Sequence, residues 1–216
     1  MVKLMQEKYL FDYLVVPGQK RIYLQHSQNS TREQKLQALA QKVCNCQSCS
    51  LRERATQVIF GAGNPEAKLM LVGEAPGAEE DKQGVPFVGA AGQLLNKILA
   101  AVEIRREEVY LANVLKCRPP ANRVPMGNEI KLCLPHLLAQ IKIIEPEIIV
   151  CLGAVAAKAL INQEARISLV RGKWFKYGKA QLLATFHPAA LLRDQSKKRF
   201  VWYDMQKVRD VYRSLI

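Results

Sequence analysis

Short apolar runs alternate along the chain with segments in which apolar residues recur every three or four positions. The runs predict buried strands at 69–72, 109–116, 148–152 and 181–186. The run 148–152 is almost wholly apolar, which is typical of a central parallel strand. Periodic segments between and after the strands predict helices, the last of them carrying an apolar stripe over 201–215. This alternation predicts an α/β fold: a three-layer α/β/α arrangement with a central, largely parallel four-stranded sheet.

Local signals divide the chain into an extension and one domain. Residues 1–29 end in a polar segment and read as an N-terminal extension outside the core, while residues 30–216 read as a single domain. Ser30 and Glu33 have the spacing of a capping box, which predicts that a helix begins after Ser30. Asn128 is the predicted cap of the helix that carries 130–144.

Charge and cysteine content narrow the class of protein. The 216 residues carry a formal net charge of +13, which favours a polyanionic partner, nucleic acid before membrane, although a generally basic protein would have the same balance. No apolar run reaches transmembrane length and the N-terminus lacks an apolar signal region, so we expect a cytoplasmic protein. Six cysteines then indicate metal binding or buried thiols more than disulfides.

The stretch 73–92, GEAPGAEEDKQGVPFVGAAG, directly follows the first predicted strand. Its five glycines and two prolines indicate special dihedral angles or backbone that a ligand approaches closely. A helix is predicted to open near Gly92. A strand, such a loop and a helix N-terminus form the usual site at the carboxyl edge of an open α/β sheet. The alternative is a surface loop that is merely rich in turn residues.

Four cysteines form a candidate metal site. Cys46 and Cys49 make a C-x2-C pair in a turn, and Cys117 and Cys133 follow on separate elements. Four thiolates suit an iron–sulfur cluster or a structural zinc ion, whereas the spacing alone equally allows buried free thiols. Cys44 is spare, and Cys151 sits inside a predicted strand and reads as core.

Three motifs, taken in order, resemble those of one family. They are GEAPG with G-x-PFVG-x-AG, Asn113 to Pro120 as N-x-x-K-C-R-P-P, and HPAALLR at 187–193. Together these motifs resemble the family-4, iron–sulfur uracil-DNA glycosylases over roughly residues 36 to 210. The resemblance implies a monofunctional, monomeric DNA-repair enzyme that flips uracil out of single- or double-stranded DNA, hydrolyses its N-glycosidic bond and leaves an abasic site. It also implies one [4Fe–4S] cluster, bound by Cys46, Cys49, Cys117 and Cys133.

The resemblance assigns catalytic roles to two residues. His187 stabilises the negative charge that gathers on the uracil O2 as the base departs. Glu74 positions or activates the water and stabilises the sugar cation. In the family-1 relatives an Asp of the first motif does this work, and its aligned position here is Ala75. The plain alternatives are a capping histidine and a carboxylate that orders the loop.

A uracil pocket needs a flat stacking face and a group that reads the base edge. Phe87 provides the face. The Asn113 amide can accept from N3–H and donate to O4, whereas cytosine presents the opposite pattern at these atoms. The predicted uracil-binding residues are Gly73, Ala75, Phe87 and Asn113.

Basic and apolar residues in the loops that follow these strands are candidates for DNA contact. The resemblance of HPAALLR implies that Leu191 or Leu192 is a minor-groove wedge and that Arg193 is a phosphate ligand. The predicted DNA-binding residues are Arg118, Arg123, Arg171, Leu191, Leu192 and Arg193. The segment 169–179 reads as a hairpin in which Trp174 and Tyr177 either stack on unpaired bases or pack into the core.

Other functions remain open at this point. The X-type branch uses a histidine in an Arg-rich insert, and the corresponding loop 118–128 contains none. A sibling acting on hypoxanthine would typically alter the first-motif glutamate, which is intact as Glu74. A non-catalytic iron–sulfur protein that binds nucleic acid, such as a replication accessory protein, is the alternative outside enzymes.

Overall fold

The computed structural model describes residues 31–215, so the predicted extension 1–29 lies outside the described part of the chain. The strands are β1 (Ala62–Gly63), β2 (Leu69–Gly73), β3 (Tyr110–Asn113), β4 (Ile148–Leu152), β5 (Trp174–Tyr177) and β6 (Ala180–Thr185). The longer helices are α2 (Arg32–Cys44), α5 (Ala90–Ala101), α6 (Gly127–Ile144) and α10 (Lys198–Arg213). The shorter ones are α3 (Leu51–Arg54), α4 (Ala78–Gln83), α7 (Ala154–Leu160), α8 (Ile167–Val170) and α9 (Pro188–Arg193).

The sheet has six strands in the order β1-β3-β2-β4-β6-β5. Its four central strands are parallel and correspond to the four predicted strands. The predicted count of four was too low, because β1 and β5 pair antiparallel at the two edges. Only two residues form β1, which gives no run long enough to read from the sequence.

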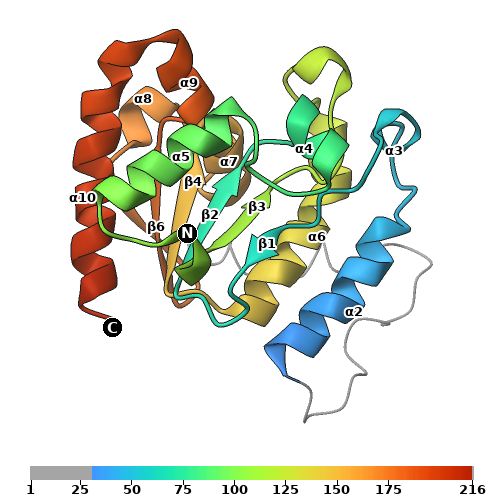
Figure 1. The fold of residues 1–216 in the computed structure, drawn as a ribbon, viewed down its shortest axis with the longest axis horizontal. Helices are drawn as coiled ribbons and strands as arrows, with labels where there is room; N and C mark the ends of the chain where they lie inside the picture. Colours follow the sequence, from blue (N-terminus) through green and yellow to red (C-terminus); the bar gives the residue numbers. More distant parts are fainter. Residues whose placement is uncertain (1–30, 216) are drawn as a thin grey trace.

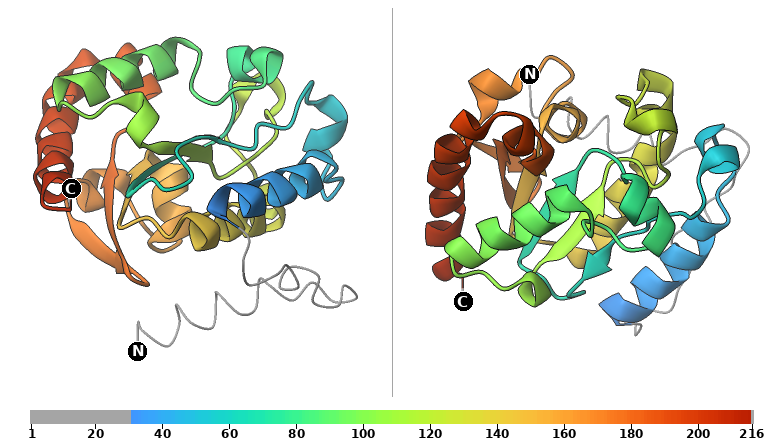
Figure 2. Two further views of the ribbon diagram at one scale, coloured as in Figure 1. Left: turned by 60° about the horizontal axis from the view of Figure 1, so that its bottom comes forward. Right: turned by 45° about the horizontal axis from the view of Figure 1, so that its top comes forward.

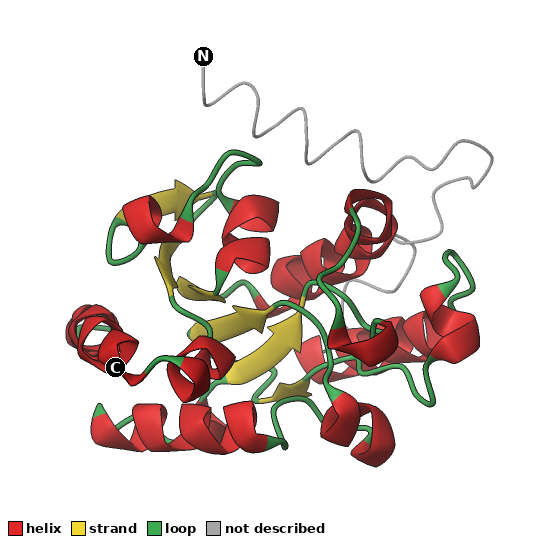
Figure 3. Ribbon diagram, turned by 90° about the horizontal axis from the view of Figure 1, so that it is seen from above, coloured by secondary structure: helices red, strands yellow, loops and turns green. Residues whose placement is uncertain are grey.

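Helices cover both faces of the sheet, which confirms the three-layer α/β/α prediction (Figures 1 and 3). Side chains alternate along each strand, so β2 sends Met70 and Val72 to one face and Leu69 and Leu71 to the other. The first face packs against α2, α6 and α7, and the second against α5, α9 and α10. Helix α2 lies alongside α6 at the outside of the molecule (Figures 1 and 2).

Several predicted boundaries move by a few residues. The cap of α2 is Thr31 rather than Ser30, and Gln34 completes its capping box because each side chain bonds the other residue's backbone N–H. The cap position of α6 is Met126, which places Asn128 inside the first turn. Helix α5 begins at Ala90, two residues before Gly92, and the short helix α4 lies within the loop that precedes it.

The hairpin expected at 169–179 begins later than predicted. Residues 167–170 form α8, and the hairpin joins β5 to β6 through a turn at Gly178, where φ is 58°. Trp174 and Tyr177 are half-buried and pack against the two core clusters, so the hairpin uses both aromatic rings as core residues.

The order of the strands defines where a site can form. The chain crosses from β2 to β3 on one side and then to β4 on the other, so the direction of the crossovers reverses at β2. Ligands of open α/β sheets bind outside the carboxyl ends of the strands at such a switch point. The ends of β2, β3 and β6 lead into the three motifs described above. Across residues 31–215, no helix is long and apolar enough to cross a membrane.

Candidate functional site

Three of the four predicted uracil-binding residues, all except Ala75, converge at the carboxyl ends of β2 and β3. Gly73 and Asn113 pair across the two parallel strands, and Phe87 returns to them from the loop. A Cβ atom on Gly73 would lie 2.6 Å from Phe87 Cζ and would overlap the Asn113 side-chain oxygen. Glycine is therefore required here, because the aromatic ring and the amide occupy the space beside it. We call Gly73, Glu74, Phe87, Asn113 and His187 the base pocket.

His187 follows β6 and caps the N-terminus of α9. Its Nδ1 accepts a hydrogen bond from the backbone N–H of Ala189 at 3.1 Å, so the proton of the neutral ring lies on Nε2. Burial, together with the positive charge of Arg193, lowers the pKa of His187 to about 4. The ring stacks beside Phe87 with centroids 6.3 Å apart. At neutral pH the pocket thus contains an uncharged imidazole whose Nε2–H is a donor.

A glycine in the neighbouring strand connection makes room for this histidine. Gly153 follows β4 with a φ of 94°, a backbone conformation that L side chains rarely adopt. A Cβ atom at Gly153 would come within 3.0 Å of His187 Cβ. The backbone N–H of Gly153 donates to Thr185 O at 2.8 Å, which ties the ends of β4 and β6 together behind the histidine.

Glu74 is half-buried directly after β2. Burial raises the pKa of its carboxyl group, and the positive charge of Arg193 opposes that rise. The backbone carbonyl of Glu74 accepts from Leu115 N at 3.0 Å, which continues the β2–β3 pairing past the end of the strands. Ala75, the next residue, packs against the small cluster that contains Cys117 and Cys133.

A buried hydrogen-bond network supports Asn113 from behind. The Lys116 side chain is fully buried, and its Nζ donates to Asn113 O at 2.9 Å and to Gln140 Oε1 at 2.5 Å. Gln140 Nε2 in turn donates to Phe60 O and to the Tyr110 hydroxyl. Because every buried polar group of this network has a partner, the network fixes the end of β3.

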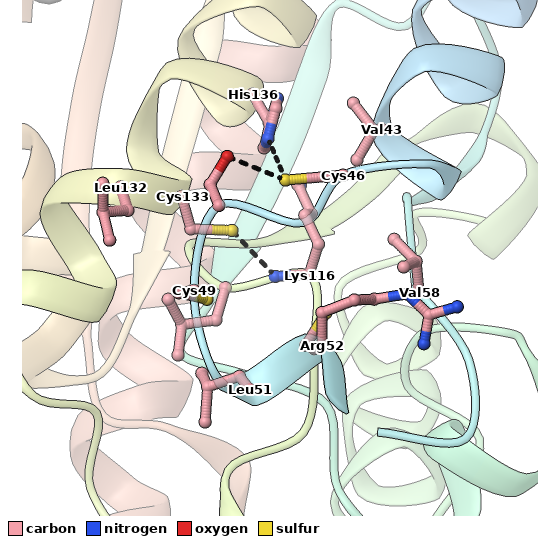
Figure 4. A pocket seen from close by; sticks show the side chains of 13 residues that line it. Val43, Cys46, Cys49, Leu51, Arg52, Val58, Lys116, Leu132, Cys133 and His136 are labelled. Atoms are coloured by element: carbon pink, nitrogen blue, oxygen red, sulfur yellow. Dashed lines mark hydrogen bonds between the residues drawn. The ribbon is translucent and has the colours of Figure 1, made fainter. Parts of the chain in front are cut away.

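The four predicted metal ligands line one largely apolar pocket (Figure 4). Cys46 and Cys49 lie between α2 and α3, Cys117 follows β3, and Cys133 projects from α6. All six cysteines are free thiols. Cys44 is exposed and Cys151 is buried within β4, and neither lines this pocket. We call the pocket lined by Cys46, Cys49, Cys117 and Cys133 the cysteine pocket.

The thiols of the cysteine pocket differ in their acidity. His136 Nε2 lies 3.4 Å from Cys46 Sγ, and this hydrogen bond is the main reason that the Cys46 pKa falls to about 6. Burial raises the pKa of Cys117 to about 12 and that of Cys133 to about 11. The backbone N–H of Lys116 donates to Cys133 Sγ at 3.2 Å. In the part of the chain that is described, no group of three or more His, Cys, Asp or Glu residues is arranged to hold a metal ion.

The predicted DNA contacts fall into two groups. Leu192 is 50% exposed on α9, whereas Leu191 is 1% exposed and belongs to the core, so Leu192 is the leucine that can reach a groove. Arg193 is exposed next to it. The structure therefore favours Leu192 over Leu191 as the DNA contact, because the Leu191 side chain packs into the core.

The other three arginines already have protein partners. Arg171 forms a bidentate ion pair with the buried Asp204, and its side chain is 19% exposed. Arg123 pairs with Glu129 and Arg118 donates to Asn122. The structure thus gives Arg171 an internal role, while Arg118 and Arg123 brace the loop between β3 and α6.

Sequence reasoning missed the residues that hold these side chains in place. Lys116 lies within a motif but read as the end of a strand, and Gln140, His136 and Arg106 carry no recognisable signal. Glu80 lies within the stretch 73–92, but the sequence gives it no separate role. Its carboxylate accepts from Gly77 N, Val88 N and Gly89 N, and so organises the whole loop. The spacing of its three partners cannot be read without the folded loop.

Comparison with known proteins gives consistent matches. A family model described as the uracil DNA glycosylase superfamily matches residues 60–206. The type-4 uracil-DNA glycosylase of Thermotoga maritima is 44% identical over 183 residues, which cover 83% of this chain and 95% of that protein. The type-4 enzyme of Archaeoglobus fulgidus is 40% identical over 184 residues, covering 82% of this chain and 92% of that protein. The type-4 enzyme of Pyrobaculum aerophilum is 44% identical over 166 residues, which cover 73% of this chain and 85% of that protein.

Proposed function

Because the chain belongs to the uracil DNA glycosylase superfamily, and within it to the type-4 uracil-DNA glycosylases, we propose that it is a DNA-repair enzyme that excises uracil. It flips uracil out of DNA, hydrolyses the N-glycosidic bond and leaves an abasic site. The observation that carries this proposal is the convergence of the Asn113 amide and the Phe87 ring on Gly73, with His187 stacked beside Phe87. The glycosylase domain comprises residues 30–216.

Base selection rests on Asn113. A base inside a duplex cannot be reached, so the target nucleotide leaves the stack and enters the pocket, where its ring lies against Phe87. The Asn113 oxygen accepts from uracil N3–H and its nitrogen donates to O4, and both contacts become repulsive with cytosine. The network from Lys116 to Gln140 holds the backbone of Asn113, which supports this role.

The departing base and the sugar need opposite kinds of stabilisation. Negative charge collects on uracil O2, where the Nε2–H of a neutral His187 donates a hydrogen bond that strengthens as the bond breaks. Positive charge collects on the sugar, where the Glu74 carboxylate stabilises it and positions the water. Arg193 favours the ionised form of Glu74 and the neutral form of His187, because one positive charge acts on both.

DNA is held at the same edge of the sheet. Leu192 enters the groove beside the flipped nucleotide and Arg193 contacts phosphate, while the loop braced by Arg118 and Arg123 lies on the far side of the pocket. The net charge of +13 makes this binding strongly dependent on salt. The enzyme acts as a monomer on single- or double-stranded DNA.

The four thiols of the cysteine pocket are the residues that would hold the cofactor of this family, one [4Fe–4S] cluster. They come from separate elements and line one apolar pocket, which supports this proposal. Hydrolysis of the N-glycosidic bond transfers no electron, so the role of the cluster would be structural. It would join the segment between α2 and α3 to the loop after β3 and to α6.

A uracil-containing oligonucleotide tests the function directly. The labelled DNA is incubated with the protein and then with alkali, and strand scission at the uracil reports glycosylase activity. Matched oligonucleotides with thymine or cytosine at that position are the controls. A mobility shift of the uracil DNA without scission would instead support the non-catalytic alternative.

A further inference from the structure

The turn that carries Phe87 holds an unfavourable backbone conformation. Phe87 has a φ of 56°, in the left-handed region that is uncommon for a residue with a side chain. Its ring is nevertheless 5% exposed and lies against Gly73 and His187. Such a conformation persists only when the surrounding structure determines it strongly.

One arginine donates hydrogen bonds to two backbone carbonyl groups of this turn. Arg106, the first residue of the 3-10 helix η1 (Arg106–Glu108), donates from Nη2 to Pro86 O at 2.8 Å and from Nη1 to Phe87 O at 3.1 Å. Its Nη1 also donates to Asn96 Oδ1 on α5 at 2.7 Å, which orients the guanidinium group. The planar fork of arginine matches two adjacent carbonyl oxygens in a way that a lysine ammonium cannot.

The backbone amide groups of the same turn donate hydrogen bonds to one carboxylate. Glu80 Oε1 accepts from Val88 N at 2.9 Å and from Gly89 N at 2.8 Å. Gly92, in the first turn of α5, leaves room for the carbonyl of Phe87, which a Cβ atom at that position would overlap. A cation on the carbonyls and an anion on the amides therefore fix the two ends of the turn 86–89.

We infer that Arg106 is a positioning residue for uracil excision: it holds the Phe87 turn so that the aromatic ring presents the stacking face of the base pocket. This inference rests on the proposed function, because the face is needed only if a flipped base enters. Arg106 itself lies outside the pocket and acts through Phe87. Its neighbour Arg105 pairs with Glu108 instead, and its side chain is 77% exposed.

The test compares Arg106→Ala with Arg105→Ala, a matched variant that removes the same side chain one position earlier. We expect Arg106→Ala to lower kcat for uracil release about 10- to 100-fold, because a small misplacement of a substrate-positioning group costs that much. Inhibition by free uracil should weaken to a similar extent, whereas affinity for uracil-free DNA stays unchanged. Arg106→Lys should be intermediate, guanidinium ion should partly rescue Arg106→Ala, and Arg105→Ala should behave as wild type.

A purely structural role would give a different result. If Arg106→Ala lowers the melting temperature but keeps wild-type kcat and wild-type inhibition by uracil below that temperature, the inference is wrong. A crystal structure of Arg106→Ala tests the positioning independently of activity, since an unmoved Phe87 turn overturns it and a displaced turn supports it. If wild-type protein releases no uracil, the proposed function fails, and the position of the turn in the variant still decides the role of Arg106.

Discussion

The base pocket and the cysteine pocket share one segment, 113–117, but they are stabilised in different ways. Side chains of the base pocket sit at strand ends and are fixed by hydrogen bonds and close glycine packing. Three of the four cysteines instead come from segments outside the strands and longer helices, and burial leaves two thiols with raised pKa values. The fold alone therefore organises the base pocket, whereas the proposed cluster would be needed to hold four thiolates together in the cysteine pocket.

The largest expected effect is on the cysteine pocket. Cys117→Ser should abolish the broad absorption near 400 nm that [4Fe–4S] proteins show, and it should lower the melting temperature and solubility, because distant elements are no longer joined. Cys44→Ser is the matched control, since Cys44 is exposed and lies outside the pocket. This variant should keep the absorption near 400 nm and the brown colour that it causes. Iron analysis checks both proteins. A colourless, zinc-containing, active wild type would contradict the cluster while sparing the glycosylase.

In the base pocket, His187→Ala should reduce kcat by about 10²–10³, because one lost donor to developing charge has that effect. Affinity for DNA should change little, since the charge on uracil O2 appears only in the transition state. Single-turnover rates and equilibrium binding to abasic-site DNA measure the two quantities separately. Equal losses in both would make His187 a structural residue, and the contrast between the two pockets would disappear.

Asn113→Asp tests base reading with a smaller expected loss. Uracil release should fall by about 5- to 150-fold, because a well-placed pair of base-edge hydrogen bonds contributes about 1–3 kcal/mol of discrimination. A protonated Asp can donate to cytosine N3, so we expect cytosine release to appear in this variant. Oligonucleotides with each base, assayed side by side, give the ratio. Asn162→Asp on the exposed surface is the control, and wild-type uracil release by Asn113→Asp would remove Asn113 from the pocket.

The smallest effect is a shift in pH dependence. The pKa of His187 is lowered to about 4 from an ordinary value of 6.5, so the neutral ring persists to acid pH. Burial raises the pKa of Glu74, so protonation of Glu74 should reduce kcat before His187 becomes charged. The unfolded chain binds the His187 proton more readily, so this group lowers the free energy of unfolding as the pH falls from about 6.5 towards 4. Arg193→Gln should move the acid limb of the rate profile to higher pH, because Arg193 lowers the pKa of both groups. An unmoved limb would show that Arg193 acts on neither.

Much of the fold could be predicted because its signals are local. The strand 148–152 appears in the structure with its predicted bounds, since five consecutive apolar residues between turn signals leave few alternatives. The start of α2 was misplaced by one residue, because Ser30 and Thr31 both have a potential capping partner three positions later. The edge strand β1 was missed because it has only two residues, and β5 was predicted only as part of a hairpin and not as a strand of the sheet, because it is half-buried.

The site was predictable at the level of its motifs and not at the level of its supports. Asn113 and His187 come together because parallel strands place their carboxyl ends at one edge, and the loop after β2 returns Phe87 to the same edge. The supporting residues act through hydrogen bonds between positions far apart in the sequence. Arg106 bonds to Phe87, 19 positions away, and Lys116 bonds to Gln140, 24 positions away. No local pattern in the sequence indicates such pairs. Leu191 and Leu192 were indistinguishable in the sequence, and only the direction in which α9 packs separates them.

The short edge strand β1 has a consequence for how these molecules behave when crowded together. An exposed strand edge offers unpaired N–H and C=O groups on which another chain can assemble, and proteins limit that risk with very short or charged edges. Ala62–Gly63 offers two residues, flanked by Gly61 with a φ of 143°. At the opposite edge Lys176 is exposed in the middle of β5. Both edges of the sheet therefore disfavour the edge-to-edge pairing by which sheets of separate copies would join.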